Sequence, residues 1–311
     1  MYEMQHILLP TDFSVHSDAA FEHAVLLGSQ QHAAITVLHV DEFVVSALGA
    51  SGVGSENIEV WRRFEQEFIE AQFERYRRAA GEKHVQLQTA VKSGRAYKVI
   101  VEESEHREYD LIVLAKRGHT RLSTALIGST AERVVRLSRQ PVLSIQDVPR
   151  TAGRIESVLC PTDLSPAGNV ALAYALSIAH QSSAILYIQY ISELEKPESE
   201  ADIRRRLPDL KEHHPQAAEV EVEYLFDRDI EPSNSIIRFS DDRDVSLIVM
   251  SAHGKKGLRR VYIGNNTAEV VRQASRPVLT VTHPFHRRIF SRPVTQQVNA
   301  TLDQKHGRTP S

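Results

Sequence analysis

The chain has 311 residues, of which 41% are hydrophobic and 25% are charged, as is typical of soluble globular proteins. Its length fits two domains of about 150 residues, each large enough to bury its own core. The net charge of -3 argues against general nucleic-acid binding. The single cysteine, Cys160, excludes an intrachain disulfide and fits a reducing compartment.

The sequence carries no signal for a membrane. No apolar run approaches the roughly 20 residues that a transmembrane helix needs. Residues 1–6 lead directly into a predicted strand, without the basic and apolar regions of a secretory signal. We therefore expect a cytoplasmic protein with no membrane partner.

In chain order, the first half alternates apolar, β-branched runs with segments that have apolar residues at helical spacing. This alternation favours a parallel sheet that is covered by helices through right-handed crossovers. The predicted strands are His6–Pro10, Ala34–Val40, Val85–Val91, a run that starts at Asp110, and Val142–Ile145. The first predicted helix is capped by Ser14 or Ser17, and the next three span Glu56–Ala80, Gly94–His106 and Ala131–Leu137. In the long second helix we expect Trp61, Phe64, Phe68 and Phe73 to form the apolar face.

The stretch from Asp110 to Ile145 has the pattern of a βαβ unit with a phosphate-binding loop. A buried strand precedes a loop that contains Gly118, and Gly128-Ser129-Thr130 then leads into a helix. Free backbone N–H groups and the positive end of a helix dipole converge on a phosphate in such units. Nearby positive charge is expected from Lys116, Arg117 and Arg121.

A polar linker at residues 147–154 separates this half from a second copy of the same pattern. Pro10-Thr11-Asp12 returns as Pro161-Thr162-Asp163, and Ser165-Pro166 is a good N-cap and first-turn pair for the next helix. Gly118, Gly128 and Pro141 return as Gly254, Gly264 and Pro277. Repetition at this level indicates a duplicated domain.

These residues carry a resemblance to the universal stress protein family. The family signature is Gly, two residues, Gly, nine residues, Gly, then Ser or Thr; here Ala115 stands first, followed by Gly118, Gly128 and Ser129. The opening strand that ends in Asp12 and the closing Pro-Val-Leu strand are also similar to the family. The chain resembles a tandem protein of this family, with domains at residues 1–147 and 154–283 and a basic, mobile tail at 284–311.

The resemblance implies an α/β fold of two flavodoxin- or Rossmann-like domains, each with a five-stranded parallel sheet in the order 3-2-1-4-5. It also implies that the halves pack through their last strands, Pro141–Gln146 and Pro277–Thr282, as single-domain members do when they dimerise. Further homodimerisation is a second expectation. Protein partners cannot be read from the sequence.

The resemblance also implies an ATP site, with Mg²⁺, in the first half. The nucleoside end would comprise Pro10, Thr11, Asp12 and Val40, and the ribose and phosphates would lie along Ala115, Arg117, Gly118, Gly128, Ser129 and Thr130. If the first glycine of the signature serves a positive φ, Ala115 is strained; if it serves close approach, a methyl group is tolerated. Otherwise these glycines serve turns only, and Asp12 caps a helix.

The second half keeps fewer of these groups. Asp163, Gly254 and Gly264 are retained, but Ser251 replaces the first glycine and Asn265 the Ser or Thr. Tyr190 is expected at the position of Val40, where a ring would stack on the base or fill its pocket. This copy is therefore either a second nucleotide site or a degenerate, structural one.

Three classes of function compete on this sequence. The first is an ATP-binding stress or signalling module in which the nucleotide changes conformation or assembly, with at most slow hydrolysis. The second is a ligand-free scaffold with degenerate sites. The third is an adenylate-transferring enzyme, which is disfavoured because its Ser-Gly-Gly-x-Asp-Ser loop is replaced by Pro-Thr-Asp-Phe-Ser. We expect no catalytic residue and no metal-ligand set, since no nucleophile elbow, Walker motif or zinc spacing occurs.

Overall fold

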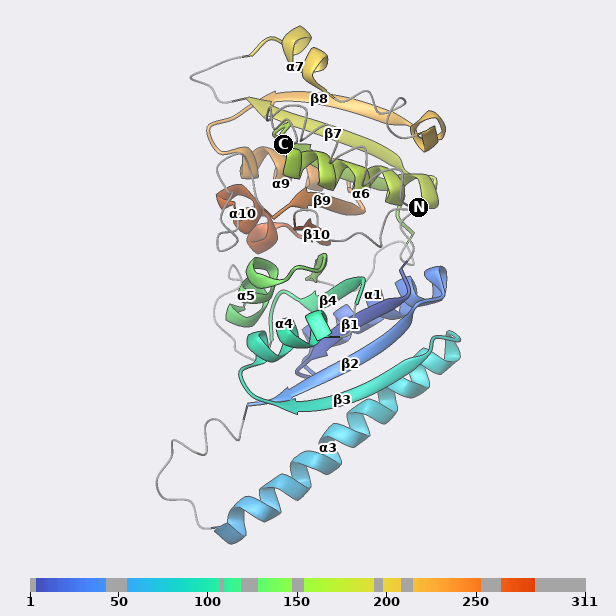
Figure 1. The fold of residues 1–311 in the computed structure, drawn as a ribbon, viewed down its shortest axis with the longest axis vertical. Helices are drawn as coiled ribbons and strands as arrows, with labels where there is room; N and C mark the ends of the chain where they lie inside the picture. The colour runs from blue at the N-terminus through green and yellow to red at the C-terminus, as the bar shows by residue number, and fades with distance from the viewer. Residues whose placement is uncertain are drawn as a thin grey trace, which may run out of the picture.

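The computed structural model describes residues 4–42, 55–106, 109–118, 128–146, 154–192, 198–207, 215–252 and 264–282. Its centre is a single ten-stranded sheet, to which each half of the chain contributes five strands (Figure 1). None of the helices in these segments is long and apolar enough to span a bilayer. The predicted basic tail and most of the linker lie outside the described residues.

The first half forms the sequence of elements that the apolar periodicity predicts. The third strand begins two residues later than expected, because a turn with His84 in the left-handed region separates it from the preceding helix. The strands are β1 (His6–Thr11), β2 (Ala34–Asp41), β3 (Leu87–Ser93), β4 (Leu111–Ala115) and β5 (Val142–Ile145); the helices are α1 (Val15–Gln31), α3 (Ser55–Glu82), α4 (Ala96–His106) and α5 (Ser129–Leu137).

The second half repeats this order, with shorter helical segments between its second and third strands. There, one long helix of the first half is replaced by a short helix and a 3-10 turn. The strands are β6 (Ser157–Thr162), β7 (Ile185–Ser192), β8 (Val222–Arg228), β9 (Leu247–Ser251) and β10 (Val278–Val281); the helical elements are α6 (Pro166–Ser182), α7 (Glu200–Arg206), η2 (Pro215–Glu219), α9 (Pro232–Asp242) and α10 (Asn265–Gln273).

The strand order confirms the predicted fold class in both halves. The complete sheet runs β3-β2-β1-β4-β5-β10-β9-β6-β7-β8, so each half has the order 3-2-1-4-5. Within each half all neighbouring strands are parallel. One apolar core lies under α1, α3 and α6, and a second lies under α4, α5, α9 and α10. This is the doubly wound arrangement that binds ligands at the carboxyl ends of its strands.

The predicted pairing of the last strands is also confirmed. β5 and β10 are antiparallel neighbours, with Leu143 opposite Leu279. Thr280 Oγ1 donates to the Val142 carbonyl at 3.2 Å, and Thr282 Oγ1 donates to the Arg139 carbonyl at 2.9 Å. Pairing satisfies the backbone groups of two edges that would otherwise be open. We call this junction the seam.

The first helices of the two halves begin with matched caps. Ser14 Oγ accepts from the Ser17 N–H at 3.2 Å, and Ser165 Oγ accepts from the Gly168 N–H at 3.1 Å. Ser14, rather than Ser17, is therefore the N-cap of α1. Pro166 occupies the first turn of α6, where its missing N–H costs nothing.

The long helix α3 departs from the expected burial pattern. Phe73 and Tyr76 are buried, but Phe64 and Phe68 are 63% and 54% exposed. Figure 1 shows that the N-terminal part of α3 extends beyond the edge of the sheet. The prediction that Phe64 and Phe68 belong to the core face was therefore wrong.

Cys160 is a core residue, as its place in the first strand of the second half indicates. It lies in β6 opposite Ile188 and is fully buried. Burial raises the pKa of its thiol to about 12. Since the thiolate is the reactive form, the native protein should hold this thiol inert.

This burial predicts how Cys160 responds to thiol reagents. At pH 8 the native chain should not react with dithionitrobenzoate over hours, because the thiol is both neutral and inaccessible. In guanidinium chloride the same sample should release one equivalent of the chromophore at once, since the sequence has one cysteine. Rapid reaction of the native protein would contradict the buried placement.

Candidate functional site

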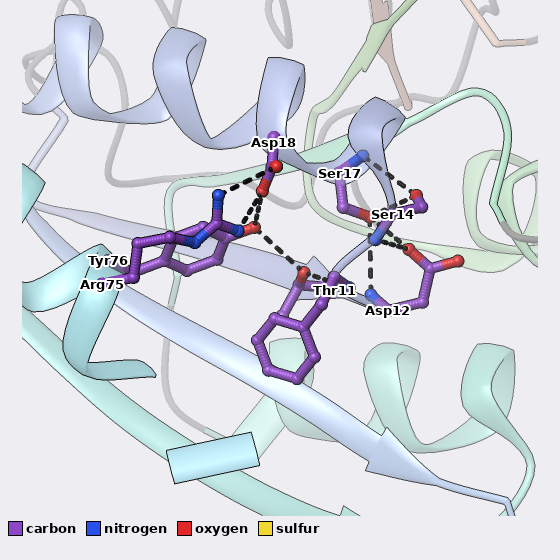
Figure 2. A network of polar contacts seen from close by, with 8 residues as sticks. Thr11, Asp12, Ser14, Ser17, Asp18, Arg75 and Tyr76 are labelled. Atoms are coloured by element: carbon purple, nitrogen blue, oxygen red, sulfur yellow. Dashed lines mark hydrogen bonds and ion pairs between the residues drawn. The ribbon is translucent and has the colours of Figure 1, made fainter. Parts of the chain in front are cut away.

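Asp12 lies between the end of β1 and the start of α1, and two hydroxyl-bearing residues fix its carboxylate. Its Oδ1 accepts from the Ser14 N–H at 3.0 Å and from Ser17 Oγ at 2.6 Å (Figure 2). The following residue, Phe13, has a φ of 60° and donates its N–H to Thr11 Oγ1 at 2.9 Å. The carboxylate is thus held in one orientation at the carboxyl end of the sheet.

Gly118 packs directly against this carboxylate. A Cβ atom built on Gly118 would lie 2.4 Å from Asp12 Oδ2, a distance at which one of the two must move. The contact follows from the fold, because β1 and β4 are neighbours and their carboxyl ends meet. The glycine therefore serves close approach, and any group that binds Asp12 Oδ2 also lies beside the Gly118 backbone.

Gly128 closes the other end of the same loop. Its N–H donates to the Lys116 carbonyl at 2.7 Å, and it is the N-cap of α5, with a φ of -64° and no side-chain cap hydrogen bond. A Cβ atom on Gly128 would have its nearest contact at 3.4 Å, so neither backbone conformation nor internal packing requires glycine. Because Gly128 has no side chain, the first turn of α5, with Ser129 and Thr130, stays accessible.

Ala115 resolves the alternative that its sequence position left open. It is the last residue of β4, pairs with Ile145, and is not among the residues with positive φ. The first signature position therefore needs no glycine for backbone conformation. Arg117 lies two residues further along the chain and is partly buried.

The predicted nucleoside end lies at the last residues of β1 and β2. Pro10 pairs with Leu38, and Thr11 pairs with His39, whose Nδ1 lies 3.0 Å from the Thr11 carbonyl oxygen. Val40 comes one residue later and packs on the opposite face, in the core under α4 and α5. All ten predicted first-half residues thus lie at the end of β1, β2 or β4 or at the start of α5.

A network that sequence reasoning did not find attaches α3 to this edge. Tyr76 OH donates to Asp18 Oδ1 at 2.7 Å and lies 3.5 Å from Thr11 Oγ1, and Arg75 forms a two-pronged ion pair with Asp18 (Figure 2). Tyr76 also stacks on Phe21 at a centroid distance of 4.0 Å. Burial is the main cause that raises the pKa of Tyr76, so its hydroxyl stays a donor. The spacing of tyrosine and arginine along a helix gives no signal for such a network.

An acidic and aromatic group lies beside the end of β2. Phe13 stacks on His39 at 4.9 Å and meets the edge of Phe68 at 6.1 Å. Burial, followed by repulsion from Asp41, raises the pKa of Glu65 on α3. Flat apolar rings next to carboxyl groups are a surface on which a heterocycle with polar edges can lie.

Lys116 does not lie at the predicted phosphate end, and that expectation was wrong. Its side chain is 1% exposed, and its Nζ donates to the Ala274 carbonyl at 2.6 Å. Ala274 is the C-cap of α10, in the other half of the molecule. A lysine at that position satisfies a helix-terminal carbonyl and complements the helix dipole. Lys116 therefore joins the two halves across the seam.

The second half keeps the backbone of this site and changes its side chains. Leu164 repeats the positive φ of Phe13, and Gly264 repeats the N-cap of Gly128. Asp163 Oδ1 accepts from the Ser165 N–H at 3.0 Å, but Gly168 stands where the first half has Ser17. Gly168 cannot supply the side-chain hydroxyl that Ser17 supplies in the first half. The retained residues Asp163, Gly264 and Asn265 lie at corresponding places, whereas Gly254 and Arg121 lie outside the described residues.

The expectation that Tyr190 takes the place of Val40 was also wrong. Tyr190 pairs with Thr162 as His39 pairs with Thr11, so its counterpart is His39, and Ile191 corresponds to Val40. Because successive side chains of a strand point to opposite faces, this one-residue difference reverses the face. Tyr190 donates its hydroxyl to Glu198 and lies under Arg206.

The comparisons with known proteins place this chain in the universal stress protein family. The sequence model of the Universal stress protein family matches residues 3–146 and again residues 154–282. The chain therefore belongs to this family and contains its domain twice.

Individual relatives agree with this assignment. Universal stress protein Slr1230 of Synechocystis is 26% identical over 294 residues, which cover 89% of this chain and 99% of that protein. Universal stress protein MJ0531 of Methanocaldococcus jannaschii is 34% identical over 143 residues, 45% of this chain and 81% of its own length. The crystal structure of a universal stress protein from Archaeoglobus fulgidus has the same fold, with a TM-score of 0.71 at 21% identity, over 92% of this chain and 99% of that one.

The position of Lys116 predicts its contribution to stability. Lys116→Met should lower the free energy of unfolding by about 1.5–3 kcal/mol, because a charge-assisted hydrogen bond is lost and a buried carbonyl keeps no donor from this side chain. Lys98→Met is the matched control, since Lys98 forms an exposed ion pair with Glu102 at 3.7 Å that is worth about 0.5 kcal/mol or less. Guanidinium unfolding followed by circular dichroism measures both; equal losses would contradict the bridging role.

Proposed function

We propose that the first half binds ATP, with Mg²⁺, and that the bound nucleotide changes the conformation or assembly of this universal stress protein. The observation that carries the proposal is the meeting of Asp12, Gly118 and the uncapped start of α5 at the carboxyl ends of β1 and β4. Open α/β sheets bind ligands at this edge. The family signature falls on the same residues.

The phosphate end of the proposed site is the first turn of α5. Backbone N–H groups at a helix N-terminus point outward, and the helix dipole favours negative charge there. Gly128 leaves this turn accessible, although the protein's own packing would accept a Cβ atom. Ser129 and Thr130 add hydroxyl donors next to these N–H groups. A triphosphate supplies the acceptor oxygens that such a turn lacks.

The nucleoside end of the proposed site is Asp12 with Pro10, Thr11 and Val40. Ser14 and Ser17 orient the Asp12 carboxylate through Oδ1, and Oδ2 faces the Gly118 backbone. A hydroxyl or amino group of a nucleoside is a donor that fits a carboxylate oxygen. Its binding would also fix the position of the glycine loop relative to α1.

The same loop offers a route from nucleotide to assembly. Lys116 directly precedes the proposed ribose and phosphate contacts, Arg117 and Gly118, and its side chain holds the C-terminus of α10 in the other half. A nucleotide that shifts this loop would therefore act on the seam. In the second half Ala252 stands at the position equivalent to Lys116, and its side chain has no donor. Only the loop of the first half can therefore hold the last helix of the other half in this way.

Two measurements on the purified protein test the proposal. The protein, isolated without added nucleotide, is denatured, and the released small molecules are separated by liquid chromatography. Adenine nucleotide at a substantial fraction of the protein concentration supports the proposal. If none is released, and calorimetric titration with MgATP shows no heat of binding at millimolar nucleotide, the chain is a ligand-free scaffold instead.

The two copies of the site should differ in affinity. Gly128→Val should abolish most ATP binding, because a branched side chain then covers the first turn of α5. Gly264→Val is the matched variant and should matter less, since Asn265 and Asn266 stand where the first half has hydroxyls. Each lost charge-assisted hydrogen bond costs about 1.5–3 kcal/mol, or about tenfold or more in affinity. Calorimetric titration with MgATP measures the affinity of both variants. If only the Gly264 variant loses affinity, the site lies in the second half and the proposal is wrong.

Gly118 provides an independent test of the nucleoside end. Gly118→Ala should weaken ATP binding by about tenfold or more, because the new methyl group displaces the Asp12 carboxylate. Gly81→Ala is the control, since no atom lies within 4 Å of a Cβ atom there. This control should bind ATP as the native chain does and gain about 0.5–1 kcal/mol of helix stability. Unchanged affinity in Gly118→Ala would exclude Asp12 from the binding site.

A further inference from the structure

A cavity of about 120 Å³ lies over the seam, on the face of the sheet that carries α1 and α6. α1 packs on β1, β4 and β5, and α6 packs on β6, β9 and β10. Neither helix covers the junction of β5 and β10 completely. The floor of the cavity therefore includes Leu143 and Leu279, which face each other across the seam.

The cavity is built from equivalent residues of the two repeats. Leu27 of α1 and Ile178 of α6 form opposite walls, and Gln30 and Gln181 follow at the same spacing on each helix. The floor pair, Leu143 and Leu279, obeys the same symmetry. Matched leucine and isoleucine walls arise because each repeat turns the same helix face toward the seam. Neither repeat alone could enclose this space.

The lining combines an apolar interior with positively charged polar groups. Two arginines, Arg154 and Arg276, and one aspartate, Asp244, are among the described residues that line it. Arg276 is 8% exposed and is held by ion pairs with Asp244 and Asp241. These aspartates balance the charge of Arg276, but guanidinium groups beside leucine and isoleucine side chains offer N–H donors, which fit a molecule with an apolar body and one anionic end.

We infer that this interdomain cavity is a binding site for a small amphipathic anion, of the class of medium-chain carboxylates. Its apolar chain lies between Leu27 and Ile178 over the Leu143–Leu279 pair, and its carboxylate lies on the side of the arginines. Apolar cavities of roughly 150 Å³ are known to take up ligands as small as benzene. The volume here is of the same order, and the cavity is partly open, so a longer chain can extend from it.

This site is separate from the proposed nucleotide site. In each half the cavity reaches the first residue of the fourth strand, Leu111 or Leu247. The nucleotide residues begin where that strand ends, at Ala115. The two proposals can therefore fail independently, and the ATP affinity of each cavity variant serves as a control.

The test is calorimetric titration of the full chain with octanoate. The native protein should bind it at micromolar to submillimolar concentrations, and Leu27→Trp and Ile178→Trp, which fill the cavity from opposite walls, should each weaken binding about tenfold or more. Glu22→Trp is the matched control on α1, because Glu22 is exposed and does not line the cavity. It should bind octanoate as the native protein does.

A charge variant and a replacement wall variant complete the test. Arg154→Gln should weaken octanoate binding severalfold while it leaves 1-octanol binding unchanged, since only the carboxylate responds to the charge. If a wall variant does not fold, Gln30→Trp at the same cavity replaces it, because Gln30 is exposed and its substitution does not disturb the core. No binding of octanoate at 1 mM, or equal binding by the native protein and the folded wall variants, would overturn the inference.

Discussion

The antiparallel pairing of β5 with β10 is the constraint on which the rest of the molecule depends. Each half ends in a short apolar strand whose outer edge would expose unpaired backbone groups, and pairing removes both edges at once. The result is one continuous sheet with a core that extends from Val25 of α1 to Ile178 of α6. The interdomain cavity and the contact of Lys116 with α10 exist only because this seam fixes the two halves together.

The fold could be predicted from the sequence because its determinants are local. β-branched runs mark buried strands, helical spacing marks α1 and its repeat α6, and Ser165-Pro166 marks a helix start, so element order and duplication follow directly. Apart from the one-residue misalignment of Tyr190, the errors concern tertiary contacts. Phe64 and Phe68 have helical spacing but are more than half exposed, and Lys116 has the sequence context of a phosphate loop but reaches another domain. Neither the exposure of the two phenylalanines nor the contact of Lys116 can be predicted from the few residues that surround each position.

The candidate site shows the same division. Asp12, Gly118 and Gly128 could be located by their motif, and the close approach of Gly118 to Asp12 gives that spacing a physical reason. From its sequence position Ser17 is predictable only as a possible cap, although its hydroxyl donates to the Asp12 carboxylate at 2.6 Å. Tyr76 lies far along the chain from Thr11 and reaches it only when α3 is packed. Side chains that support a site from another helix or strand lie outside its sequence motif, so the motif does not predict them.

The two repeats agree in backbone at the sheet edge but differ in the side chains of the proposed site. Both keep a left-handed residue after the aspartate and a glycine N-cap on the last helix, features that shape the chain at the sheet edge. Only the first keeps Ser17 and the hydroxyls at the start of α5; Gly168 and Asn265 stand in the second. The left-handed residue, which belongs to the backbone of the fold itself, persists in both copies. The hydroxyl groups that we propose as ligand contacts persist in one, which is the pattern expected if the first half binds nucleotide and the second does not.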